Sequence, residues 1–122
     1  MADKRIQKAI DRLEKSLTPT WWVSPDELTV KDGHKVFDAE KAVVHELLNK
    51  DLQNNPDALA LAQVIVGVDR SLAQNAIDNS TGVKPGVGKA LDEMAKGDSD
   101  RTNGKYESAI DHYKHAWEKV AK

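Results

Sequence analysis

Residues 56–79 form the most apolar segment of this sequence, and their spacing is that of one long helix. Asn54-Asn55-Pro56 provides a capping residue and a proline at the first helical position, and Asn79-Ser80-Thr81-Gly82 provides the end. Apolar residues between these limits cover more than half of the helix circumference: Leu59, Leu61, Ala62, Val64, Ile65, Val66, Val68, Leu72, Ala73, Ala76 and Ile77. A helix that is apolar around most of its girth belongs at the centre of a bundle. We therefore expect this helix to be the central one of the fold.

Apolar residues three and four positions apart predict helices on both sides of this segment. One starts near Asp3 and ends before Pro19, a second is capped by Asp38, and a weaker one fades near Gly97. The stripes are Ile6, Ile10, Leu13 and Leu17; Val43, Val44, Leu47, Leu48 and Leu52; Val87, Leu91 and Met94; and, after the turn at Asn103-Gly104, Tyr106, Ala109, Ile110, Tyr113, Ala116, Trp117 and Val120. The sequence predicts an all-α fold in which residues 1–122 form a single domain of four long helices, arranged as two antiparallel hairpins.

The connection over residues 18–37 is the least regular part of the chain and holds Trp21 and Trp22. Within it, Ser24-Pro25-Asp26-Glu27 has the layout of a capping box with a proline at the first helical position. This pattern predicts a short helical turn, closed by Asp32-Gly33.

Composition excludes several classes of protein. Lys and Arg number 18 against 20 Asp and Glu, a net charge of −2, so the basic excess of a nucleic-acid binder is missing. The sequence has no Cys, which excludes thiol catalysis and thiolate zinc sites. Its longest run poor in charge, 58–68, is too short to span a membrane. The charged N-terminal stretch lacks the apolar core of a signal peptide, so we expect either a cytoplasmic protein or a domain excised from a longer one.

The last helix suggests a family. Gly104-Lys105-Tyr106-Glu107-Ser108-Ala109-Ile110-Asp111-His112-Tyr113-Lys114-His115-Ala116-Trp117 resembles the second helix of a tetratricopeptide repeat, and Gly97 falls where that repeat has its small packing residue. Lys96 and Asp100 depart from the repeat, and the pattern has no second copy, whereas an array needs about three. We expect a tetratricopeptide-like hairpin at the end of the bundle.

The order of features along most of the chain is similar to that of a helical module near the C-termini of bacterial secreted and cell-surface proteins. These features are an amphipathic helix, a Trp-containing segment, Asp32-Gly33-His34, an Ala-rich helix with Asp69-Arg70, and the closing helix that begins at Gly104. The resemblance implies an accessory or spacer domain without catalytic residues, located outside the cell or on its surface.

Asp69 is the most informative polar residue, because its neighbours at helical spacing place it on the most buried face of the central helix. An unpaired carboxylate there would cost several kcal/mol. We expect Asp69 to be a buried polar anchor paired with a Trp indole, a Tyr hydroxyl, or a Lys or Arg. The weaker alternative is a small enzyme built around Asp69, which would need a second ionisable group across a cleft.

His112 and His115 lie three residues apart on the last helix, and such a pair joined by a carboxylate can bind Zn or Cu. We favour partly exposed structural histidines, with a metal-binding bundle as the alternative. The stretch Asp98–Gly104 does not have the spacing of a calcium loop.

Most aromatic residues gather in two places, and Trp21, Trp22, Tyr106, Tyr113 and Trp117 are the candidates for the core or for contact with a partner. We expect a non-catalytic interaction or spacer module of a larger bacterial extracellular or surface protein. Its partner would be a protein or another domain of the parent chain, without cofactor, nucleic acid or membrane span.

Overall fold

The computed structural model describes residues 2–25, 27–52, 54–80 and 86–121. Within these ranges the chain is mostly helical, in agreement with the all-α prediction. The only sheet among the described residues is a pair of very short strands. The α-helices are α1 (Ala2–Ser16), α2 (His34–Leu47), α3 (Pro56–Asp78), α4 (Val87–Thr102) and α5 (Tyr106–Val120). Short 3-10 helices η1 (Pro19–Trp21) and η2 (Lys50–Leu52) and strands β1 (Trp22–Ser24) and β2 (Glu27–Leu28) connect them. The prediction of four long helices is one too few, because α4 is a full helix.

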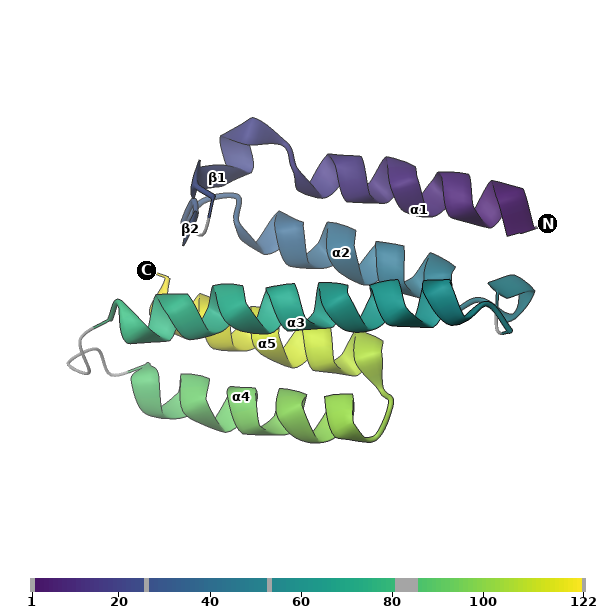
Figure 1. The fold of residues 1–122 in the computed structure, drawn as a ribbon. Coiled ribbons are helices and arrows are strands. Elements are labelled where there is room, and N and C mark those ends of the chain that lie inside the picture. The colour runs from purple at the N-terminus through teal and green to yellow at the C-terminus, as the bar shows by residue number, and fades with distance from the viewer. Residues whose placement is uncertain (1, 26, 53, 81–85, 122) are drawn as a thin grey trace.

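The five α-helices lie side by side in one bundle (Figure 1). α1 packs along α2, α4 packs along α5, and α3 contacts α2, α5 and the edge of α4. Thus α2, α3 and α5 form the centre, while α1 and α4 flank it. The largest fully buried apolar and aromatic side chains come from α2, α3 and α5: Phe37, Val36, Val43, Val44, Val66, Ile110 and Tyr113.

α3 begins and ends where the sequence predicts, but it is not enclosed. The Asn55 side chain accepts hydrogen bonds from the backbone N–H groups of Asp57 and Ala58, and Pro56 opens the helix. Asn79 caps the other end, whereas Thr81 and Gly82 lie outside the described residues. One side of α3 is buried and the other is open to solvent, so the helix lies at the centre of the bundle as predicted, but only part of its apolar circumference is covered.

α2 starts four residues before the predicted cap, at His34. Gly33 is buried beside the ring of Trp117, where a Cβ would lie 2.6 Å from two ring carbons, and its N–H donates to the Thr29 carbonyl. This tight turn leads directly into the helix. Asp38 is therefore an interior residue of α2, and it accepts a hydrogen bond from Lys114 of α5 rather than capping the helix.

The 18–37 connection contains a hairpin where the sequence predicts a helical turn. β1 and β2 pair antiparallel, with Trp22 opposite Leu28 and Ser24 opposite Glu27, and Asp26 lies outside the described residues. The hairpin places Leu28 in the core, and the Trp22 indole N–H donates to the Ser16 carbonyl at the end of α1. Burying these two side chains favours the extended conformation over the capping-box turn. The helical turn of this connection comes earlier, at η1.

α4 continues past Gly97 to Thr102 because Gly97 is a contact point rather than a stop. A Cβ at Gly97 would lie 2.5 Å from Cε1 of Tyr113, so the absent side chain lets α5 approach α4 closely. The following turn at Asn103-Gly104 is confirmed, with Gly104 at φ +76°. Among the described helices, none is both long and apolar enough to cross a membrane.

Candidate functional site

Asp69 is fully buried, as predicted, but its partner is a second acid. Glu40 of α2 faces it, and the two side chains are 5% and 0% exposed. Both carboxylate oxygens of Asp69 and Oε1 of Glu40 receive no hydrogen bond from an N–H or hydroxyl group of the described residues. The expectation of an indole, a phenol, or a Lys or Arg is therefore wrong. A proton shared between the two carboxyl groups gives one oxygen of each a hydrogen-bond partner, because one group then donates to the other.

The surroundings of this acid pair favour that shared proton. Burial raises the pKa of Asp69 well above its usual value, and the hydrogen bond and negative charge of Glu40 raise it further. Burial also raises the pKa of Glu40, which its hydrogen bonds with Asp69 and Ser16 partly offset. With Asp69 sealed from solvent, a substrate has no path to it in this arrangement, so the pair has the geometry of a structural element.

Arg70, next to Asp69, points to a different acid. Its guanidinium donates to both carboxylate oxygens of Asp98 on α4, at 2.8 and 3.2 Å, and the Tyr113 hydroxyl donates to Asp98 at 2.6 Å. The Arg70 guanidinium and this hydroxyl hold the pKa of Asp98 below its usual value, against partial burial. Asp98 thus ties α3, α4 and α5 together, a role that nothing in its local sequence indicates.

The five aromatic candidates divide into two groups. Tyr113 and Trp117 belong to the core, where Trp117 lies 5.8 Å from the ring of Phe37. Trp21, Trp22 and Tyr106 keep some exposed surface but already have intramolecular contacts. Trp21 lies beside the Lys35 ammonium, and Tyr106 accepts a hydrogen bond from Gln63. Of the five, only Trp21, Trp22 and Tyr106 are therefore exposed enough to contact a partner.

His112 and His115 lie on the side of α5 that faces α4, and Glu93 of α4 joins them. One ligand atom from each of the three side chains falls within 4.8 Å of the other two. Nδ1 of His112 lies 2.6 Å from Oε2 of Glu93, and the two imidazole rings are 6.4 Å apart in an edge-on arrangement. His112 and Glu93 are partly buried, whereas His115 is exposed.

Neighbouring charges orient this Glu93/His112/His115 cluster. Partial burial acts to raise the pKa of Glu93, but the hydrogen bond with His112 and the charge of Lys96 outweigh it, so the pKa lies below its usual value. Oδ2 of Asp100 lies 3.5 Å from Nε2 of His112, on the far side of the ring from Glu93. Glu93 and Asp100 were not among the predicted site residues, because the sequence does not show how α4 is aligned against α5.

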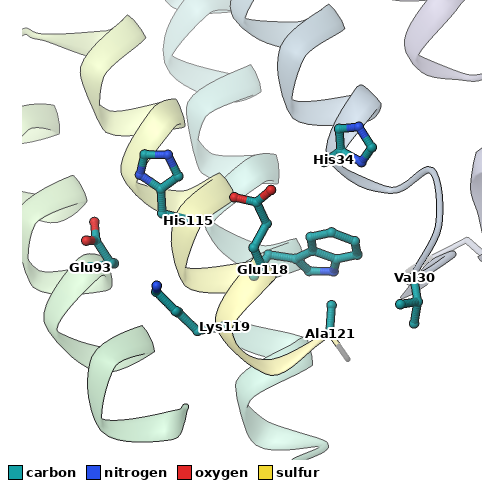
Figure 2. A pocket seen from close by; sticks show the side chains of 8 residues that line it. Val30, His34, Glu93, His115, Glu118, Lys119 and Ala121 are labelled. Carbon is teal, nitrogen blue, oxygen red and sulfur yellow. The ribbon is translucent and has the colours of Figure 1, made fainter.

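A cavity of about 570 Å³ adjoins the cluster, because Glu93 and His115 belong to the cluster and also line the cavity. Figure 2 shows its wall, with Glu93 on α4, His115 and Lys119 on α5, and His34 on α2 at the opposite side. Trp117 also lines the cavity. The cavity is therefore lined by acidic side chains, basic side chains and an aromatic ring. The fourth histidine, His45, lies away from it and pairs with Glu107.

The open side of α3 carries exposed apolar side chains. Leu61, Val64 and Val68 are 40%, 60% and 42% exposed and follow one another at spacings of three and four, so they form a single stripe. No charged residue occurs between Ala58 and Val68. This α3 stripe was predicted as core, and the structure leaves it uncovered.

Comparison of the chain with protein-family models, with curated proteins and with solved structures finds no match.

Proposed function

We propose that this chain is a non-catalytic helical module that packs against another protein through the α3 stripe, Leu61, Val64 and Val68. The observation that carries the proposal is the exposure of three consecutive apolar positions of one helix face. Removing apolar surface from water contributes about 25 cal/mol per Å². A single contact can cover all of a continuous stripe, whereas it would cover only one of several scattered side chains.

The chemistry of the α3 stripe defines the partner. Because residues 58–68 carry no charge, the partner surface needs no compensating charges and is best matched by the apolar face of an amphipathic helix. Asp57, which is exposed, precedes the stripe and offers the partner a polar contact at that end. A helix of another domain in the same parent chain fits this description as well as a separate protein does.

We infer a module of a larger bacterial extracellular or surface protein from the resemblance over most of the chain. The close approach of Gly97 and Tyr113 supports a tetratricopeptide-like packing of α4 on α5, since that repeat also places a small residue at the helix crossing. The sealed acid pair supports a role without catalysis at Asp69.

The test compares two triple variants, each of which replaces three exposed apolar side chains with Gln. L61Q/V64Q/V68Q removes the α3 stripe, and L17Q/L59Q/L91Q removes three exposed apolar side chains that are not contiguous. Binding of the apolar dye 8-anilinonaphthalene-1-sulfonate, thermal unfolding and mass by light scattering are measured for each. We expect the first variant to lose most of the dye binding of the wild type at an unchanged unfolding temperature, and the second to keep it.

Two results would overturn the proposal: dye binding that does not depend on the α3 stripe, or a lower unfolding temperature of the first variant. The latter would mean that the stripe already contributes to the fold of the isolated chain. A dimer that only L61Q/V64Q/V68Q dissociates would support the proposal and identify a second copy of the chain as the occupant.

A further inference from the structure

We propose that Glu93, His112 and His115 bind a divalent first-row transition metal ion, tested here as Zn²⁺, between α4 and α5. The site is independent of the α3 stripe, because it lies in the α4–α5 hairpin and shares no residue with α3. One carboxylate and two imidazoles form a ligand set that suits Zn²⁺, Cu²⁺ or Ni²⁺ better than Mg²⁺ or Ca²⁺, which favour oxygen ligands throughout.

The distances between the three ligand atoms are near those of a zinc site. Zinc takes nitrogen and oxygen ligands at about 2.0–2.2 Å, which places the ligand atoms of a tetrahedral site about 3.4 Å apart. The atoms here lie within 4.8 Å of one another, and the Glu93–His112 pair is at 2.6 Å. An ion between these two requires them to separate by about 1 Å. His115 is exposed, so it can change rotamer to complete the set with little loss of packing.

Asp100 supplies a second observation that favours a metal site. A histidine that binds a metal usually donates its other ring N–H to a carboxylate, which fixes the tautomer and the ring orientation. Oδ2 of Asp100 lies 3.5 Å from Nε2 of His112, while Nδ1 faces Glu93. Asp100 is thus placed to orient His112 with Nδ1 toward the ion. Asp100 is a positioning residue in this proposal, not a ligand.

The adjoining cavity determines what else such an ion meets. Three protein ligands leave a fourth position on zinc for water or a small ligand. Glu93 and His115 line the cavity of about 570 Å³, so the open position faces a space that Lys119 also lines. An ion here would join α4 to α5 and hold an exchangeable ligand at the cavity wall. Lys96, 3.8 Å from Oε1 of Glu93, competes for the carboxylate and limits the affinity.

The chain contains a matched control for this site. Nδ1 of His45 on α2 lies 3.1 Å from Oε1 of Glu107 on α5. This imidazole–carboxylate pair resembles the pair that His112 of α5 forms with Glu93 of α4. No third ligand group accompanies it among the described residues. If zinc simply bound to any surface histidine, His45 and His115 would contribute equally to zinc binding. The proposed site instead requires three ligands, which only Glu93, His112 and His115 provide among the described residues.

Zinc binding is measured by isothermal titration calorimetry on chelator-treated protein without a histidine tag. The wild type, E93Q, H115Q, D100N and H45Q are compared, with circular dichroism to verify folding. We expect one Zn²⁺ per chain with a higher unfolding temperature when zinc is bound. D100N should weaken binding about tenfold, E93Q and H115Q should weaken it further, and H45Q should leave it unchanged.

Three results would overturn the proposal: no heat of zinc binding by the folded wild type, binding that survives both E93Q and H115Q, or equal weakening by H45Q and H115Q. Because His115 is exposed, H115Q keeps its fold and decides the outcome even if E93Q is unstable. Visible absorption of the Co²⁺-loaded protein gives a second readout, which H115Q should change and H45Q should not.

Discussion

Replacing Asp69 with Asn should stabilise the protein at neutral pH, although it alters a fully buried side chain. The Asn amide has almost the same shape as a protonated carboxyl group and donates to Glu40 without needing a bound proton. Wild-type Asp69 can make this hydrogen bond only when the acid pair is protonated. The substitution therefore retains the packing and removes the titration.

The magnitude follows from the proton that the folded state holds. Unfolded Asp and Glu release their protons near pH 4, whereas burial and the contact with Glu40 raise the pKa of Asp69 well above that value in the folded state. Stability from the protonated pair is complete below the unfolded-state pKa and is lost as the pH rises toward the folded-state pKa. One extra bound proton corresponds to about 1.4 kcal/mol of unfolding free energy per pH unit over that range.

Urea denaturation followed by Trp fluorescence at intervals between pH 4.5 and 8 measures this slope. We expect wild-type stability relative to D69N to fall by at most about 1.4 kcal/mol for each pH unit. The matched control is D98N, because Arg70 holds the pKa of Asp98 below its usual value. That group contributes stability above the unfolded-state pKa and loses it as the pH falls, so D98N should cost stability at neutral pH.

Parallel pH profiles for wild type and D69N would refute the shared proton. So would a loss of stability in D69N at pH 7.5 as large as that of D98N, since it would mean that the Asp69 carboxylate is the favoured form at that pH.

Two further substitutions test the packing of α4 on α5 by thermal and urea unfolding. G97A should destabilise by about 1–3 kcal/mol, because its Cβ would lie 2.5 Å from the Tyr113 ring; a neutral effect would show that the helices separate at no cost. Y113F should cost about 1–2 kcal/mol, since it removes a 2.6 Å hydrogen bond to a charged acceptor while Arg70 still pairs with Asp98. In the Asp98→Asn background the cost of Y113F should shrink, and an unchanged cost would contradict the role of Asp98.

Helical periodicity predicts most of the secondary structure because each helix carries its apolar residues in a local pattern. The caps at Asn55 and Asn79 and the turn at Gly104 are local too, and the structure confirms them. The hairpin at β1 and β2 is different. Its formation depends on burial of Leu28 against residues far along the chain, which outweighs the local capping preference of Ser24.

The pairing of polar side chains has no local signal at all. Asp69 is recognisable as buried from its neighbours, yet Glu40 lies 29 residues earlier, within the polar positions of its own helix. Predicting their contact requires the register of α2 against α3, which periodicity does not provide. The exposed α3 stripe is misread for a related reason, because an apolar helix face reports a preference for burial and not whether this chain supplies the cover.

The α4–α5 hairpin links a feature that the sequence shows to one that it does not. Gly97 marks a close crossing of the two helices, and this crossing holds Glu93, one turn before Gly97, against His112, next to Tyr113. A methyl group at Gly97 must push α5 away from α4, and the Glu93–His112 distance grows with that separation. If Glu93, His112 and His115 bind zinc, G97A should therefore weaken zinc binding as well as stability, although residue 97 offers no ligand. An alanine at exposed Gly88, which is also in α4 but where a Cβ meets nothing within 4 Å, should weaken neither.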